Sequence, residues 1–153
     1  MANTYTQLYV HLVFAVKFRN ASIQKNWNER LHKYLTGIFQ NNKHKMIQIN
    51  SMPDHIHIFI GLNPDQSISS IVRNVKSEST KWIKNEGFCP FPFAWQDGYG
   101  AFSHSRSQLS KVISYIENQE AHHAKKDFLT EYRDLLKAFD IDYSEAYIFK
   151  ELR

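Results

Sequence analysis

The chain of 153 residues predicts one α+β domain, an antiparallel sheet with two helices packed on one face. The length suits one domain with a proper core and hardly two. Apolar and polar residues alternate along one segment, and apolar residues recur at helical spacing in two others, which predicts strands and helices respectively. No internal repeat or low-complexity tract interrupts them. The sheet face without helices is free to carry a site.

Four segments predict strands. Apolar residues occupy the even positions of 8–18, while the odd positions are mixed or polar, which predicts a half-buried strand. A short strand is expected at 45–51 and, after a turn, another at 55–62. The aromatic segment 93–102 predicts the fourth strand, with a turn or bulge near Asp97.

Two amphipathic helices are expected between these strands. Apolar residues at helical spacing predict a helix over 22–42 and a second over 68–83, which Asp65 or Ser67 would cap. Gly87 and the prolines after it end the second helix. The resulting order, β-α-β-β-α-β, is the ferredoxin-like split βαβ arrangement.

The remaining chain predicts a C-terminal helical part. A third helix follows Ser105 or Ser107 and carries the apolar residues Leu109, Val112, Ile113 and Ile116. A last amphipathic stretch begins near Phe128 and is followed by a short tail. We therefore expect a main domain over 1–130 and a C-terminal helix and tail, 131–153, packed on the same domain.

Composition excludes several classes of protein. The chain is 42% apolar and 22% charged, which is globular rather than disordered. The single Cys89 excludes a disulfide framework and a cysteine-based zinc cluster, and it fits a reducing compartment. No apolar run reaches the length of a membrane span, and no signal-peptide pattern is expected at the N-terminus. The net charge of +4 permits a nucleic-acid partner without proving one.

His55 and His57 lie two residues apart in the third expected strand. Side chains alternate along a strand, so the two imidazoles project from the same face, with Cβ atoms roughly 7 Å apart. Two histidines in that position can bind one metal ion. Eight histidines in a chain of this length also fall two apart by chance, so the pair alone is weak evidence.

Tyr115 and Gln119 are neighbours at i, i+4 on the expected third helix. A tyrosine on a helix flank most often packs with its hydroxyl in water, and the glutamine is by default solvated. The functional alternative is a nucleophile one turn from a metal ligand. A free phenol ionises near pH 10, so attack at neutral pH needs help from a metal or a base.

The segment 52–60, MPDHIHIFI, resembles the HUH motif (His, bulky hydrophobe, His) of the IS200/IS605-family single-tyrosine transposases. The resemblance spans most of the chain. Further segments are similar to the family's opening strand (9–19), serine- and lysine-bearing helix (67–84), aromatic strand (95–103), tyrosine helix (115–119) and usual ending (128–149). Several ordered motifs at family-like spacing are more specific than any one of them.

This resemblance implies a DNA transposase that cleaves and rejoins single-stranded DNA at hairpin-marked ends. Tyr115 would attack the phosphate and form a 5′-phosphotyrosine link, and His55, His57 and Gln119 would hold one divalent ion. The link retains the phosphodiester energy, so no ATP is needed, in agreement with the missing phosphate-binding GxxxxGK[ST] loop. Imidazole ligands often suit zinc or other transition ions. The family implies Mg²⁺ or Mn²⁺, of which Mn²⁺ fits two histidines more easily.

The implied partners are single-stranded DNA with hairpins and a second copy of the chain. The expected location is the prokaryotic cytoplasm, at the nucleoid during the reaction, with no membrane partner. Candidate backbone contacts are Lys17, Arg19, Arg73, Lys76, Lys84, Arg106 and Lys111, with Lys81, Lys125 and Lys126 as further cations. Trp95, Tyr99 and Phe102 are candidates for stacking on bases, although core packing is expected for at least one.

Other histidines and tyrosines have less support. His11 projects from the polar face of the first strand and could lie beside the site. His122 and His123 follow Gln119 closely, and a surface role is the better expectation for both. Rival nucleophiles exist on count alone, Tyr143 and Tyr147, but packing is expected for them.

Two questions stay open at this point. Family members that exchange the tyrosine helix between subunits can use glycines as a hinge, and no glycine follows Gly100 here, so assembly of the site in cis or in trans is undecided. Other readings are a domesticated relative that processes palindromic repeats, a non-catalytic ferredoxin-like module that binds single-stranded DNA or RNA, and a metal-dependent hydrolase that uses water. The RNA-binding string K/R-G-F/Y-G/A-F-V-x-F/Y does not occur in the sequence.

Overall fold

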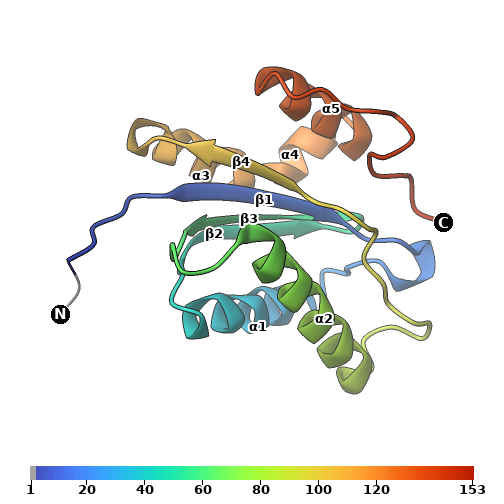
Figure 1. Ribbon diagram of the computed structural model, residues 1–153. Helices are drawn as coiled ribbons and strands as arrows, with labels where there is room; N and C mark the ends of the chain where they lie inside the picture. Colours follow the sequence, from blue (N-terminus) through green and yellow to red (C-terminus); the bar gives the residue numbers. More distant parts are fainter. Residues whose placement is uncertain (1–2) are drawn as a thin grey trace.

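A computed structural model describes residues 3–153 as a four-stranded antiparallel sheet with strand order β2-β3-β1-β4. The elements confirm the predicted β-α-β-β-α-β order and the α+β class (Figure 1). In chain order they are β1 (Tyr9–Ala15), α1 (Asn28–Asn41), β2 (Lys45–Met52), β3 (His55–Gly61), α2 (Ile68–Glu86), β4 (Gly100–His104), α3 (Leu109–Glu117), α4 (Gln119–His123) and α5 (Phe128–Ala138).

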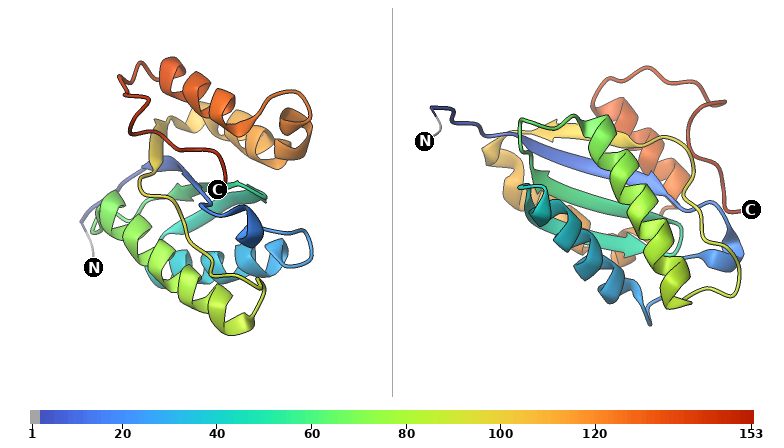
Figure 2. Two further views of the ribbon diagram at one scale, coloured as in Figure 1. Left: turned by 90° about the vertical axis from the view of Figure 1, so that its right-hand side faces the viewer. Right: turned by 60° about the horizontal axis from the view of Figure 1, so that its bottom comes forward.

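The sheet separates two helical layers. α1 and α2 cover one face, as predicted, and α3, α4 and α5 lie on the other (Figure 1; Figure 2, left). Along β3 the side chains alternate: Ile56 and Ile58 enter the core under α1 and α2, whereas Phe59 packs against Val112 and Ile116 of α3. The pleat of β3 therefore turns the odd-numbered residues, including the two histidines, toward α3, α4 and α5.

β1 ends earlier than the sequence predicts, and α1 begins later. The strand is shorter than 8–18 because the backbone N–H of Val16 donates to the carbonyl of Asp54 and that of Lys17 to the carbonyl of Ala94, outside the regular ladder. The first helix begins at Asn28 rather than at residue 22. A 3-10 turn, Arg19–Ala21, and a loop precede it, and the buried Ile23 packs from that loop.

The aromatic segment before β4 is buried without being a strand. Trp95 forms one isolated bridge with Val16, and the strand itself begins only at Gly100. The ammonium of Lys76 on α2 donates to the carbonyls of Gln96 (2.8 Å) and Gly98 (2.6 Å). These carbonyls are satisfied by a side chain rather than by a neighbouring strand, which explains why the ladder is absent there.

α5 is anchored over the start of β4 through Gly100. A Cβ atom on Gly100 would lie 2.8 Å from the Tyr132 hydroxyl, so only glycine allows this approach. The tail then returns to the body: Phe149 is buried against Tyr132, and Arg153 pairs through its backbone with Lys17. The division expected after residue 130 falls inside α5.

None of the helices among residues 3–153 combines the length and the apolar character needed to cross a membrane.

Candidate metal and nucleophile site

His55 and His57 are fully buried on β3, with ring centroids 5.0 Å apart. Their position two residues apart on one strand places both on the α3–α5 side of the sheet, as the sequence predicts. Two imidazoles buried side by side, away from the apolar core, form the base of the site.

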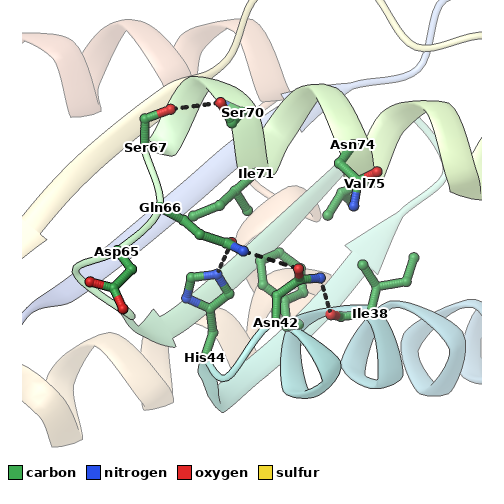
Figure 3. A pocket seen from close by; sticks show the side chains of 11 residues that line it. Ile38, Asn42, His44, Asp65, Gln66, Ser67, Ser70, Ile71, Asn74 and Val75 are labelled. Carbon is green, nitrogen blue, oxygen red and sulfur yellow. Dashed lines mark hydrogen bonds between the residues drawn. The ribbon is translucent and has the colours of Figure 1, made fainter. Parts of the chain in front are cut away.

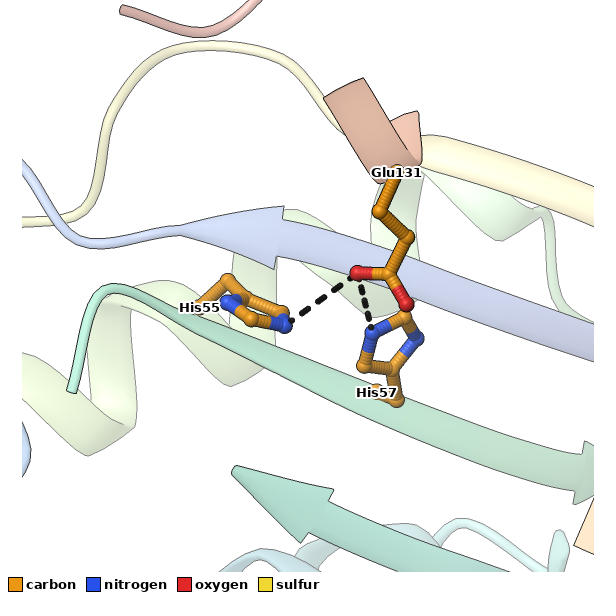
Figure 4. Close-up of side chains that lie close together, drawn as sticks. All are labelled: His55, His57 and Glu131. Carbon is orange, nitrogen blue, oxygen red and sulfur yellow. Dashed lines mark ion pairs between the residues drawn. The ribbon is translucent and has the colours of Figure 1, made fainter. Parts of the chain in front are cut away.

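Glu131 of α5 lies directly over the two histidines (Figure 4). Its Oε1 is 3.5 Å from Nε2 of His55 and 3.4 Å from Nε2 of His57, and one ligand atom from each residue lies within 4.8 Å of the others. Burial alone would raise the pKa of Glu131, but hydrogen bonding to His123 and the nearby His57 hold it well below its usual range. The site therefore contains a buried carboxylate facing two imidazoles.

Gln119 reaches the same cluster. Its side chain is fully buried, its Oε1 lies 3.1 Å from Nε2 of His55, and its Nε2 donates to Glu131 at 3.0 Å. The expectation of one continuous helix carrying Tyr115 and Gln119 is wrong. α3 ends at Glu117 and α4 begins at Gln119, because Asn118 between them has φ −96° and ψ 24° and leaves the helical conformation.

The hydroxyl of Tyr115 donates a hydrogen bond to Oε2 of Glu131. Burial, together with the charge of Glu131, raises the pKa of Tyr115 above its ordinary value. The phenol is thus held protonated, with its oxygen directed at the carboxylate that faces His55 and His57. All of these residues come from one chain.

The opposite edge of each histidine ring has its own partner. Nδ1 of His55 is 2.7 Å from Oδ1 of Asp54, and Nδ1 of His57 is 2.8 Å from Nε2 of His11. Burial lowers the pKa of His57 to about 4, so the ring is neutral near pH 7. Nε2 of His57 is buried and has no hydrogen-bond partner among residues 3–153, although it faces Glu131 at 3.4 Å. His11 therefore lies beside the site, as one reading of the sequence proposed.

His123 belongs to the site, contrary to the surface role expected from the sequence. Its Nε2 lies 3.0 Å from Oε1 of Gln119 and 3.1 Å from Oε1 of Glu131, and its side chain is only 10% exposed. Burial opposes protonation, but Glu131 raises the pKa of His123 overall. His122 remains exposed, with its ring centroid 4.9 Å from that of Tyr115.

Sequence reasoning missed Glu131. A signal was present, because Glu131 lies three residues after Phe128 and four before Leu135, on the apolar stripe of α5. Acidic residues are almost never fully buried without a partner, so a carboxylate on that stripe indicates a buried polar site. Phe128 itself stacks on His55, with ring centroids 4.0 Å apart, which brings α5 onto the histidines.

The basic candidates do not form one surface. Lys111 lies beside Tyr115 in a hollow along α3, whereas Arg73 and Lys76 line another hollow between α2 and residues 94–99 on the opposite layer. Lys76 differs from the rest because its ammonium already binds two carbonyls, and burial lowers its pKa to about 8. The other candidates are exposed or half-buried at separate places, namely Lys17, Arg19, Lys84 and Arg106.

Only one of the three aromatic candidates for base stacking is exposed. Phe102 is 1% exposed, and Trp95 packs edge-on against Phe14 and donates from Nε1 to the hydroxyl of Ser79. Tyr99 is 37% exposed. The packing expected for Tyr147 is wrong, because its side chain is 90% exposed in the tail.

A third hollow, of about 470 Å³, lies between the end of α1 and the start of α2, on the layer opposite Tyr115 (Figure 3). Its polar side chains bind one another: Gln66 pairs with His44 at 2.8 Å and donates to Asn42 at 3.0 Å. Gln66, His44 and Asn42 thus hydrogen-bond one another, and the hollow does not contain a cluster of imidazoles and a carboxylate like that at His55 and His57.

Comparison with known proteins agrees with this site. The family described as "Transposase IS200 like" matches residues 4–119. This chain belongs to the IS200-like transposase family. The transposase is an enzyme that cleaves and transfers strands of single-stranded DNA, which confirms the family and the activity that the sequence motifs imply. The family match ends at Gln119, so Glu131 and His123 lie beyond it.

Two relatives illustrate the extent of the likeness. The ISDra2 transposase TnpA of Deinococcus radiodurans is 26% identical over 122 residues, which are 74% of this chain and 84% of the relative. The solved structure of a REP-associated tyrosine transposase bound to a REP hairpin is 13% identical and matches with a TM-score of 0.61. The match covers 100% of this chain and 96% of the REP-associated transposase, so the shared fold includes the region of α5.

Proposed function

We propose that this transposase cleaves single-stranded DNA with Tyr115 as the nucleophile, beside one divalent ion held by His55, His57, Glu131 and Gln119. The observation that carries the proposal is the position of Glu131. One of its carboxylate oxygens accepts the hydrogen bond from Tyr115, while the other faces Nε2 of both histidines.

The chemistry of these residues fits a metal ion. Within the described part of the chain, Nε2 of His57 is buried without a hydrogen-bond partner, which is costly unless another group binds it. The cluster offers two imidazole nitrogens, a carboxylate and a carboxamide oxygen, a mixed set that Mn²⁺ or Mg²⁺ can accept. A bound divalent ion would polarise a phosphoryl oxygen and stabilise the leaving 3′ oxygen.

The residues behind the histidines orient them. The carboxylate of Asp54 accepts from Nδ1 of His55, so that Nε2 of this ring is the nitrogen that would bind a metal ion. Nδ1 of His57 lies 2.8 Å from Nε2 of His11, so a proton on Nδ1 would be held by His11 and would leave Nε2 of His57 free to bind a metal ion. Such outer partners fix the tautomer and the ring orientation of metal ligands.

Tyr115 supplies the attacking oxygen. Its Oη forms a bond to phosphorus as the bond from phosphorus to the 3′ oxygen breaks, giving a 5′-phosphotyrosine link. The phenolic proton passes by way of Oε2 of Glu131, the atom to which Tyr115 already donates, to solvent, and the released 3′ oxygen takes a proton from solvent, so that no net proton is gained or lost. Because the link keeps the phosphodiester energy, a second 3′ hydroxyl can reverse the step and join a new strand.

The proposed DNA partner carries hairpins. The REP-associated transposase of similar fold is bound to a REP hairpin, which supports a hairpin-bearing substrate here. Arg73 and Lys81 on the exposed side of α2 offer two cations next to the half-exposed Tyr99. We place backbone contacts there and at Lys111, Arg106, Lys84, Lys17 and Arg19, with the reaction in the prokaryotic cytoplasm.

The site assembles within one chain. β4 ends at His104, the 3-10 turn Arg106–Gln108 leads into α3, and no glycine interrupts this connection. The C-terminal part, residues 131–153, belongs to the same domain, since it supplies Glu131 to the site. We propose that a homodimer, if formed, has two sites in cis. Mixing Tyr115→Phe with His57→Ala protein tests this, because sites in cis stay inactive in every mixed dimer and exchanged helices would restore one functional site.

A covalent adduct tests the proposed reaction. The protein is incubated with Mn²⁺ and a labelled pool of single strands in which a hairpin is flanked by random bases, and the products are separated on a denaturing gel. We expect a labelled adduct that is absent in Tyr115→Phe and much reduced in His57→Ala. Tyr147→Phe, which alters an exposed tyrosine, is the matched control and should retain the adduct. An adduct that survives Tyr115→Phe, or cleavage without any covalent species, contradicts the proposal.

The second candidate is a domesticated enzyme that processes palindromic repeats with the same residues. The full-length structural match to the REP-associated transposase favours it, because the match includes α5 and the tail. Transfer of the cleaved strand to a second labelled DNA distinguishes the two candidate functions. A transposase would join the cleaved strand to the second DNA, whereas a processing enzyme would release cleaved palindromes without joining them to new targets.

A further inference from the structure

Two hollows flank the ring of Tyr115. One, of about 610 Å³, lies between α4 with its following turn and α5. The other, of about 450 Å³, runs along the exposed side of α3 next to Lys111. Tyr115 and His122 line both hollows, so these two residues form the ridge between them.

The ring of His122 is placed to stack on a flat group. It is exposed, its centroid lies 4.9 Å from that of Tyr115, and the two planes are tilted by 40°. An exposed imidazole presents a face on which an unpaired base can stack. Because Tyr115 supplies the attacking oxygen, a base stacked on His122 would belong to a nucleotide near the cleaved bond.

The hollow between α4 and α5, called here the α4–α5 pocket, combines apolar walls with charged side chains of both signs, Lys125, Lys126, Glu131 and Asp134. Ala121, Leu135 and Ala138 supply the apolar wall atoms. Lys125 stands at the rim and has no ion-pair partner among residues 3–153, whereas Lys126 binds Asp134 across the rim at 2.5 Å. A single-stranded nucleotide is complementary to this pattern, since its base is flat with apolar faces and its phosphate is anionic.

We propose that the α4–α5 pocket binds the unpaired nucleobase next to the scissile phosphate, with the free face of His122 stacked on this base. The inference rests on the proposed function, because the phosphate must reach Tyr115. A strand whose phosphate lies at the Tyr115 hydroxyl continues on both sides of it, and the two hollows on either side of the ridge can receive the flanking nucleotides. Lys125 on one side and Lys111 on the other are placed to contact the adjoining phosphates.

Binding of a fluorescein-labelled single strand of twenty thymidines, measured by anisotropy in EDTA on the Tyr115→Phe background, tests the pocket without cleavage or metal. We expect His122→Ala to weaken binding about 5- to 50-fold, the range expected for loss of stacking on one base. His122→Phe should keep most of the affinity. Ala138→Phe, which fills the pocket from α5, should weaken binding, whereas Ala146→Phe, a matched change at an exposed alanine in the tail, should not.

Unchanged affinity in both His122→Ala and Ala138→Phe would overturn the pocket while leaving the proposed reaction intact, because the covalent adduct is measured separately. The same conclusion would follow if His122→Phe bound as weakly as His122→Ala, because stacking would then not be the cause. If the Tyr115→Phe protein without further changes did not bind the strand at all, both proposals would be contradicted. Melting temperatures of the variants confirm that each is folded.

Discussion

Tyr115 on α3 and Glu131 on α5 are joined by a hydrogen bond from the phenol to the carboxylate. The same carboxylate faces His55 and His57 through its other oxygen. One acidic side chain from the C-terminal helix therefore connects Tyr115, the proposed nucleophile, to the histidine pair. This arrangement makes α5 part of the site rather than a cover on the domain.

Replacing Glu131 by Gln should weaken Mn²⁺ binding. The histidines and Gln119 are neutral ligands, so Glu131 supplies the negative charge of the set. We expect the dissociation constant for Mn²⁺, measured by isothermal titration calorimetry, to rise at least about 10-fold, because loss of an outer partner alone costs about 10- to 100-fold. Glu145→Gln, at an exposed carboxylate paired with Arg133, is the control. Equal constants for the parent and Glu131→Gln would rule out this carboxylate as a ligand.

His11 should set the affinity for metal without touching it. Its Nε2 lies 2.8 Å from Nδ1 of His57, so His11→Phe keeps the ring volume and removes the partner that orients His57. We expect Mn²⁺ affinity to fall about 10- to 100-fold in His11→Phe. His11→Gln, which can still accept a hydrogen bond, should recover part of the loss in the same titration. Affinity that is unaffected by His11→Phe would show that the pairing is only structural.

A methyl group at Gly100 should loosen the docking of α5. The added Cβ would lie 2.8 Å from atoms of the Tyr132 ring, so either Tyr132 or the strand must shift. We expect Gly100→Ala to lower the free energy of unfolding by about 1–3 kcal/mol. Gly37→Ala in α1 is the matched control: nothing lies within 4 Å of its Cβ, and the same change there should stabilise the fold by about 0.4–1 kcal/mol. Urea unfolding measures both, and equal effects would contradict the steric role of Gly100.

His32 should make the fold sensitive to acid. Burial lowers the pKa of His32 to about 4, from an ordinary value near 6.5, and its Nε2 lies 2.7 Å from the Ser51 hydroxyl. Between these two pH values the unfolded chain binds a proton on His32 that the folded chain does not. This contribution to stability is therefore present above pH 6.5 and is lost as the pH falls toward 4.

We expect His32→Gln to reduce the loss of unfolding free energy between pH 7 and pH 4.5 by about 1–3 kcal/mol relative to the parent. Glutamine does not titrate and can keep the hydrogen bond to Ser51. Urea midpoints at several pH values measure the difference. The same pH dependence in both proteins would show that His32 does not titrate as proposed.

Local sequence patterns predicted which helices and strands exist better than they predicted where each helix or strand begins and ends. Alternation along β1 and β3 and the helical spacing in α1 and α2 were sufficient, because each pattern reports which side of an element is buried. Ser67 caps α2 as one of the two expected residues, by accepting from the N–H of Ser70. The fourth strand was predicted to begin too early, at residue 93 instead of Gly100, because Trp95 is buried through contacts with Ser79 and Phe14. Period-two counting cannot distinguish such burial from burial in a strand.

By itself the sequence determined the α+β class, the family, and the identity of His55, His57, Tyr115 and Gln119 as the residues to examine. Those conclusions depend on short spacings and ordered motifs, which are properties of the chain alone. Only the tertiary structure showed that these four side chains lie close together and that Glu131 and His123 join them. The physical reason is that α5 reaches the histidines through contacts between distant residues, Phe128 on His55 and Tyr132 over Gly100, and such contacts leave no local pattern.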